Sequence, residues 1–157
     1  MARVLIVGCG CHGRSLAAEL VAAGHTVRGT TRDPARLAEI EAAGAEGIVA
    51  DPDRLGGVMG ALAGVTLVCW LMGDAVATPA LHGDRLHTLM ERLVDTPVRG
   101  LVYEAGGTVD PELLAAGAAI VREASVTWHI PVRVVHVARG DCWLEAMTGA
   151  VDGLLTR

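Results

Sequence analysis

The run VLIVGCGCHG, residues Val4–Gly13, decides the fold of this chain. Its aliphatic first half predicts a buried strand, and its glycines then follow in the spacing G-x-G-x-x-G. In a strand–turn–helix unit Gly8 permits the sharp turn, Gly10 lets a phosphate approach bare backbone, and Gly13 lets the helix lie close to the strand. The free N–H groups at the start of that helix favour a pyrophosphate. The contacts expected with a bound dinucleotide are Gly8, Gly10, Cys11, His12 and Gly13.

The rest of the chain alternates aliphatic segments with helical patterns, which predicts a three-layer, doubly wound α/β Rossmann fold. Its six parallel strands are expected in the order 3-2-1-4-5-6, within a single NAD(P)-binding domain covering residues 1–157 and without room for an appended substrate domain. The strands are expected at Arg3–Val7, Thr26–Thr30, Gly47–Ala50, Thr66–Leu71, Val98–Glu104 and Pro131–Val137. The helices are expected at Arg14–Ala23, Pro34–Ala43, Pro52–Ala63, Asp84–Val94, Pro111–Ser125 and Asp141–Leu154.

Composition limits the classes of partner. The 157 residues are 52% hydrophobic and contain no Phe, so one core must be built from aliphatic side chains, as in a parallel sheet buried on both faces. A formal charge of −5 and the lack of a basic stripe argue against a nucleic-acid partner. All basic residues are Arg, so mechanisms that need lysine are excluded.

No signal peptide or membrane-spanning run is visible, so we expect a cytoplasmic protein without a membrane partner.

The irregular spacing of the four cysteines does not predict disulfides. Cys9, Cys11 and His12 suggest a metal or redox cluster, but metal ligation there would block the phosphates. Filling of the core or loop is the preferred interpretation, redox sensing is the alternative, and no metal is expected.

The end of the second strand predicts the form of the cofactor. An acidic residue there would hold the ribose hydroxyls of NAD, whereas this chain has Thr30-Thr31-Arg32. Arg32 would bind a 2′-phosphate bidentately, with Thr31 donating its hydroxyl, and Arg14 would add a second positive charge. Asp33 comes one position late and is expected to cap the next helix. We therefore expect NADP rather than NAD; the alternative is that Arg32 is a solvated surface arginine.

The glycine loop, together with Val27–Pro34, resembles the atypical short-chain dehydrogenase/reductase group of the NmrA-like kind. Ala50-Asp51-Pro52, 61–65 and 100–103 match further stretches of that group. The resemblance implies that Asp51 meets the adenine. Leu71, the last residue of the expected fourth strand, and Met72, which follows it, are expected to line the same site.

The resemblance fails where reductases of the group carry a Tyr-x-x-x-Lys pair. Tyr103 is followed four positions on by Gly107, and the chain has no Lys. Tyr103 and Glu104 are therefore the candidates for a catalytic role that stays unknown. The preferred interpretation of Tyr103 is a packed or hydrogen-bonded residue. Glu104 stands at the carboxyl end of the fifth strand, where it serves either proton transfer or anchoring of the loop through backbone N–H groups.

Other polar residues carry weaker signals. Asp74, His82 and His87 follow the fourth strand near the expected nicotinamide end, and each is more readily explained as a solvated residue. A second group near the sixth strand suggests a pocket or a subunit interface, with His136 expected to be buried. That group is Trp128, His129, His136 and Trp143.

Three functions remain open. The first is an NADP(H)-binding protein of the atypical reductase type, with a reductase or isomerase-like activity that uses non-standard groups, or with none. The second is a non-catalytic, cofactor-sensing regulatory module. The third is the regulatory domain of a potassium transport system, which Arg32 disfavours because such domains carry an acidic residue at that place. A small domain with an unroofed pocket also predicts a homodimer.

Overall fold

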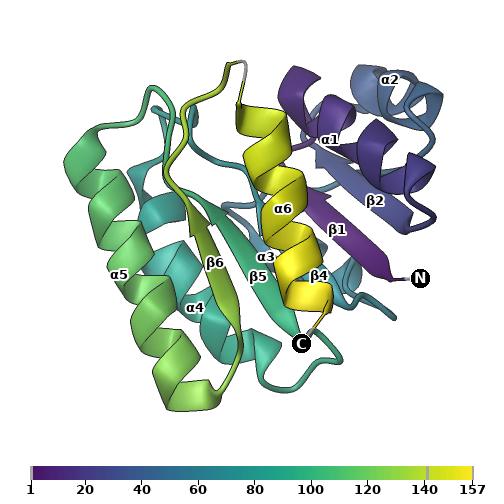
Figure 1. Ribbon diagram of the computed structural model, residues 1–157. Coiled ribbons are helices and arrows are strands. Elements are labelled where there is room, and N and C mark those ends of the chain that lie inside the picture. The colour runs from purple at the N-terminus through teal and green to yellow at the C-terminus, as the bar shows by residue number, and fades with distance from the viewer. Residues whose placement is uncertain (1, 141, 157) are drawn as a thin grey trace.

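The computed structural model describes residues 2–140 and 142–156. Its core is a six-stranded, all-parallel sheet in the order β3-β2-β1-β4-β5-β6, which confirms the predicted topology (Figure 1). The strands are β1 Arg3–Val7, β2 Thr26–Thr31, β3 Glu46–Val49, β4 Leu67–Trp70, β5 Gly100–Glu104 and β6 Val132–Val135. The helices are α1 Cys11–Ala22, α2 Leu37–Ala42, α3 Leu55–Gly60, α4 Asp84–Leu93, α5 Pro111–Trp128 and α6 Trp143–Leu155, with short 3₁₀ helices η1 Pro34–Arg36 and η2 Pro79–His82.

Helices cover both faces of the sheet, which gives the three expected layers. One apolar cluster lies between the sheet and α1, α2 and α6, and a second lies between the sheet and α3, α4 and α5 (Figure 1). The central strands are buried on both faces, and β4 has no residue more than 1% exposed. This explains why they read as unbroken aliphatic runs rather than as alternating patterns.

Several helix boundaries differ from the predicted ones for local reasons. Helix α1 begins at Cys11 rather than Arg14, because Gly10 already takes the extended cap conformation and 11–13 form the first turn. The segment after Asp33 starts as the 3₁₀ helix η1, with the Asp33 carboxylate accepting a hydrogen bond from Ala35 N (2.9 Å). The third helix is shorter than predicted, since its glycines are poor helix formers.

The last third of the chain shows two further differences. Helix α5 continues to Trp128 and stops at His129, which takes the left-handed conformation (φ 57°). Strand β6 ends at Val135, two residues before the predicted end. The predicted start of the last helix, Asp141, lies outside the described residues. No helix in the described segments is both long and apolar enough to cross a membrane.

Candidate functional site

A cavity of about 640 Å³ opens at the carboxyl edge of the sheet, over the ends of β1, β2 and β4. This volume falls in the range of cofactor sites, and the position is where open α/β sheets bind ligands. Its floor is the turn after β1, one wall follows β2 and β3, and the other follows β4. The lining residues are Gly8–Cys11, Arg14, Thr30–Asp33, Arg36, Ala50–Pro52, Leu71, Met72, Asp74–Thr78, Leu81 and Arg139.

The turn after β1 has the geometry that a phosphate loop requires. Gly8 has φ +88°, and a Cβ there would collide with the Met72 side chain and the Leu71 carbonyl. Its N–H donates to Thr30 Oγ1 (3.1 Å). A Cβ on Gly10 would meet nothing within 4 Å, so the backbone there is open to a ligand. The turn and the start of α1 therefore fit a pyrophosphate.

Eight of the ten predicted contact residues line this cavity, and two do not. The His12 ring instead contacts the Trp143 ring edge-on at 5.5 Å, on the side of α1 that faces α6. Gly13 is buried, and a Cβ there would lie 3.0 Å from the Gly8 carbonyl oxygen. Gly13 therefore does not face the cavity, and its lack of a side chain lets α1 approach β1 closely.

The cysteines near the loop have different environments. Cys9 is buried against Gly29, and this burial, opposed only in part by the charge of Arg14, raises the pKa of its thiol to about 11. A thiol with that pKa stays protonated near neutral pH, so it is not a ready nucleophile. Cys11 is exposed at the rim of the cavity. Within the described residues, no group of three or more His, Cys, Asp or Glu side chains is placed to hold a metal ion.

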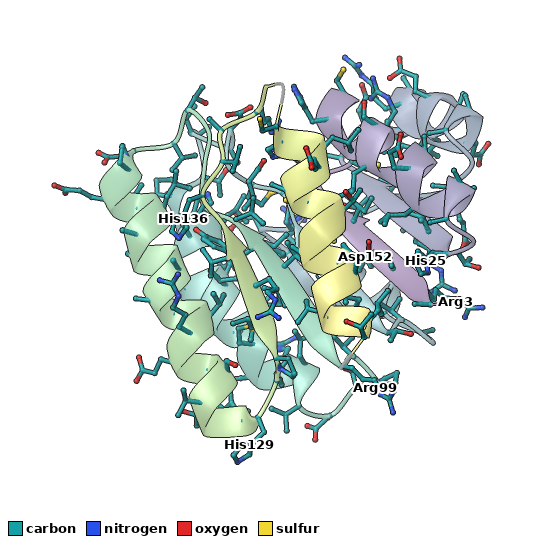
Figure 2. All side chains as sticks on the ribbon, viewed as in Figure 1. Arg3, His25, Arg99, His129, His136 and Asp152 are labelled. Atoms are coloured by element: carbon teal, nitrogen blue, oxygen red, sulfur yellow. The ribbon has the colours of Figure 1, made fainter. Side chains whose placement is uncertain are left out.

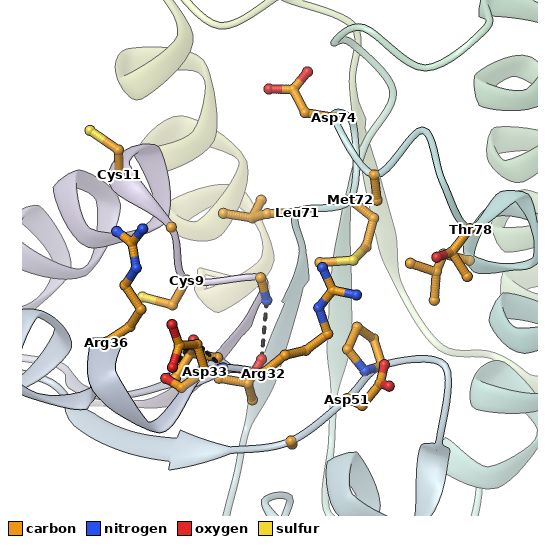
Figure 3. A pocket seen from close by; sticks show the side chains of 18 of the residues that line it. Cys9, Cys11, Arg32, Asp33, Arg36, Asp51, Leu71, Met72, Asp74 and Thr78 are labelled. Atoms are coloured by element: carbon orange, nitrogen blue, oxygen red, sulfur yellow. Dashed lines mark hydrogen bonds between the residues drawn. The ribbon is translucent and has the colours of Figure 1, made fainter.

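Three arginines surround the β2 end of the cavity. Arg14 and Arg36 both reach Glu39 Oε2, at 3.2 and 3.4 Å, whereas no hydrogen bond or ion pair of the Arg32 side chain occurs among the described residues. Arg32 directly follows β2 and Arg36 ends η1, and Figure 3 shows Arg32 pointing toward Met72 and Arg36 toward Cys11. Sequence reasoning missed Arg36, although it lies only four positions after Arg32, in the same connection between β2 and α2.

The opposite end of the cavity rests on Glu104, which has no exposed surface (0%). Its Oε1 accepts from Gly73 N (2.8 Å) and Arg139 Nη2 (3.0 Å), and its Oε2 accepts from Arg139 Nε (3.0 Å) and Trp143 Nε1 (2.8 Å). These bonds tie together the loops after β4 and β6 and the start of α6. Of the two predicted roles of Glu104, anchoring the loop through a backbone N–H is the one that the structure displays.

Asp74 joins this network at the cavity wall. It accepts from Thr108 N (2.8 Å) and Thr108 Oγ1 (3.0 Å), and its Oδ2 lies 2.9 Å from Arg139 Nη1. Burial acts to raise the pKa of Asp74, but the Thr108 hydrogen bonds and the Arg139 charge outweigh it and lower that pKa. Sequence reasoning missed Arg139, because its loop lies 65 residues from Asp74 along the chain.

His82 corrects an expectation. It was predicted to be solvated, but it is fully buried (0% exposed), because η2 folds it against β5. Its Nε2 donates to the Met72 carbonyl (2.8 Å), so its Nδ1 accepts from the Tyr103 hydroxyl. Burial lowers the pKa of His82, against the opposing effects of Met72 and Glu104, and raises the pKa of Tyr103. Tyr103 has the packed, hydrogen-bonded environment that was preferred for it.

The residues grouped around the sixth strand do not form one cluster. His136 was expected in the core but is exposed, because β6 ends before it, and its ring lies 3.4 Å from Arg122 Nη2. Figure 2 shows His129 and His136 at opposite ends of β6. Trp143 is buried against Glu104. His87 is exposed on α4 beside Glu91, as expected for a solvated residue.

The family comparison gives a clear result. Residues 8–116, more than half of the chain, match the sequence model of a family described as NAD(P)H-binding. No curated protein matches the chain as a relative. The match covers the glycine loop, the arginine-rich wall and the loop after β4, and ends early in α5.

Solved structures share the fold at low identity. A Bacillus halodurans protein assigned as an NAD-dependent epimerase/dehydratase has a TM-score of 0.72 and 20% identity, over 88% of this chain and 71% of that one. An Agrobacterium tumefaciens short-chain dehydrogenase/reductase superfamily protein with bound NAD has 0.68 and 20%, over 85% and 48%. UDP-glucuronic acid 4-epimerase from Bacillus cereus, in complex with NAD, has 0.69 and 13%, over 85% and 55%. The chain thus spans about half the length of the last two. The expected resemblance is confirmed as far as an NAD(P)H-binding family and a fold shared with a short-chain dehydrogenase/reductase superfamily protein.

Proposed function

Because the chain belongs to the NAD(P)H-binding family, we propose that its cavity binds NADP(H) in preference to NAD(H). The observation that carries this proposal is the set of three arginines, Arg14, Arg32 and Arg36, at the β2 end of the cavity. The ribose of the adenine half lies at that end in a Rossmann fold. A 2′-phosphate placed there would meet guanidinium groups, which bind phosphate bidentately.

The residues around this end fit the adenine half. Asp33, the nearest carboxylate after β2, is engaged as the cap of η1. Asp51 lines the same cavity, and its Oδ1 accepts from Asp53 N (2.9 Å), which holds the turn after β3. The pyrophosphate would sit on Gly10 and the start of α1, because the first backbone N–H groups of a helix have no partner within the helix and favour an anion.

Regulation by the cofactor is the role we favour over hydride transfer. Glu104 and Tyr103, the two candidate catalytic residues, are fully buried, and their polar atoms are held by Arg139, Trp143 and His82. Neither lines the cavity, so neither reaches a substrate without rearrangement of the network. This favours a cofactor-sensing module. Homodimerisation and a cytoplasmic location stay predictions.

The experiment is a titration of NADPH and NADH against the Arg32→Ala variant. Loss of one charged hydrogen-bonding partner should weaken NADPH binding by about tenfold or more and leave NADH binding unchanged. Arg92→Ala, which removes an exposed arginine from α4, is the matched control and should bind both cofactors as the wild type does. Equal weakening of NADPH and NADH by Arg32→Ala would contradict a 2′-phosphate site at this position.

A further inference from the structure

Asp74 and Arg139 lie at the end of the cavity away from the three arginines. Figure 3 shows Asp74 and Asp51 at opposite ends, with Leu71 and Met72 between them. If the adenine half lies beside Asp51 and Arg32, as proposed above, a dinucleotide crossing the glycine loop brings its nicotinamide half to Asp74 and Arg139. This inference rests on that placement.

The pair is held rigidly from behind. Arg139 makes two hydrogen bonds to buried Glu104, both 3.0 Å, and its guanidinium lies 5.8 Å from the centre of the Trp143 ring. Asp74 is held by two hydrogen bonds from Thr108. The Asp74 and Arg139 side chains remain 41% and 18% exposed, so they form the surface of the cavity rather than its interior. A polar pair fixed in this way costs little to order when a ligand binds.

Each member of the pair keeps hydrogen-bonding capacity that its contacts within the protein do not use. A guanidinium has five N–H groups, and three of those of Arg139 reach Glu104 and Asp74. Within residues 2–140 and 142–156 this leaves one N–H without a partner on each of Nη1 and Nη2. Asp74 Oδ1 accepts two hydrogen bonds and Oδ2 accepts one, so Oδ2 has a further acceptor position. A spare donor and a spare acceptor therefore stand side by side, on atoms 2.9 Å apart.

We propose that the Asp74–Arg139 pair recognises the carboxamide of the nicotinamide ring. A primary carboxamide carries an acceptor and two donors on one planar group, and it matches the pair, with its oxygen on Arg139 and its NH₂ on Asp74 Oδ2. The charges of Asp74, Glu104 and Arg139 sum to one negative charge. A neutral amide suits this environment better than a carboxylate, which Asp74 would repel.

The test compares three ligands that differ only at this end of the molecule. They are NADP⁺, its 3-acetylpyridine analogue, which replaces the amide NH₂ by a methyl group, and 2′-phospho-ADP-ribose, which lacks the ring. The wild type should bind NADP⁺ about tenfold more tightly than the acetylpyridine analogue, which is the effect of one charge-assisted hydrogen bond, and more tightly still than 2′-phospho-ADP-ribose, which makes neither contact. Asp74→Asn should abolish most of the difference between NADP⁺ and the acetylpyridine analogue and leave the affinity for 2′-phospho-ADP-ribose unchanged. Asp152→Asn, an exposed site on α6, is the matched control.

The outcomes separate this inference from the function on which it rests. Equal affinity of the wild type for NADP⁺ and its acetylpyridine analogue would overturn carboxamide recognition, and this comparison needs no variant. Equal weakening of all three ligands by Asp74→Asn would overturn it as well. Failure of every ligand to bind the wild type would overturn the proposed function and the inference together.

Discussion

Glu104 is a buried carboxylate that accepts four hydrogen bonds, two of them from Arg139. Its position at the end of the fifth strand was predictable from the sequence, but its partners were not. Arg139 and Trp143 lie 35 and 39 residues further along the chain, and only the folded sheet brings them to Glu104. From the sequence, Glu104 could serve either in proton transfer or in anchoring a loop. Its contacts with residues distant in sequence favour anchoring.

Replacing Glu104 by Gln tests this structural role. The Gln amide would direct N–H groups at Arg139 or Trp143, leaving a buried charge without its partner, and should lower the free energy of unfolding by about 3 kcal/mol. Urea denaturation of Glu104→Gln measures the loss. Glu123→Gln, at an exposed position on α5, is the control and should change stability little. Wild-type stability of Glu104→Gln would contradict an anchoring role.

His82 gives the fold a dependence on pH. Its pKa is lowered in the folded protein, first by burial, so the unfolded chain binds its proton more readily. Stability from this group is complete above the ordinary histidine pKa of about 6.5 and declines as pH falls below it. The lowered pKa of Asp74 acts in a separate, more acidic window, below its ordinary value. The free energy of unfolding should therefore fall between pH 7 and pH 5.

Urea denaturation across that pH range measures this decline. The His82→Gln variant is less stable at neutral pH, but its stability should change less between pH 7 and pH 5, because the group that takes up the proton on unfolding is gone. A decline of the same size in His82→Gln as in the wild type would assign the pH dependence to other groups.

At the scale of elements, two helical glycines differ in how closely their helix packs against the sheet. On α5, a Cβ at Gly117 would collide with the Tyr103 hydroxyl, whereas on α6 a Cβ at Gly149 would meet nothing within 4 Å. Both positions are helical, so alanine is preferred at each by about 1 kcal/mol from backbone propensity. The sequence shows two equivalent helical glycines, and only packing against the sheet distinguishes them.

The pair of variants Gly117→Ala and Gly149→Ala follows from this difference. Gly149→Ala should raise stability by up to about 1 kcal/mol. Gly117→Ala should lower it by roughly 1–3 kcal/mol, since α5 must move away from Tyr103. Thermal or urea denaturation of both variants measures whether each substitution raises or lowers the free energy of unfolding. Stabilisation by both substitutions would show that α5 does not pack on β5 as closely as described.

The order of strands and the place of the phosphate loop were predictable because they depend on local signals: aliphatic runs, turn glycines and helix caps. The ends of helices and strands were less predictable. Strand β6, for example, stops at Val135 and leaves His136 exposed. The near half of the cavity comes from β1 and β2, which are adjacent in sequence, so Arg32 was predictable. The far half is formed by the loops after β4 and β6, which are distant in sequence, so the role of Arg139 was not predictable.

For the whole molecule, the central claim is that this cavity binds NADP(H) and distinguishes it from NAD(H). The most direct test is the dissociation constant of the wild-type protein for NADPH and for NADH, measured side by side by calorimetry at one salt concentration. We predict that NADPH binds more tightly than NADH by about tenfold or more, because the arginines bind its 2′-phosphate. Equal affinities, tighter binding of NADH, or no binding of either cofactor would contradict it.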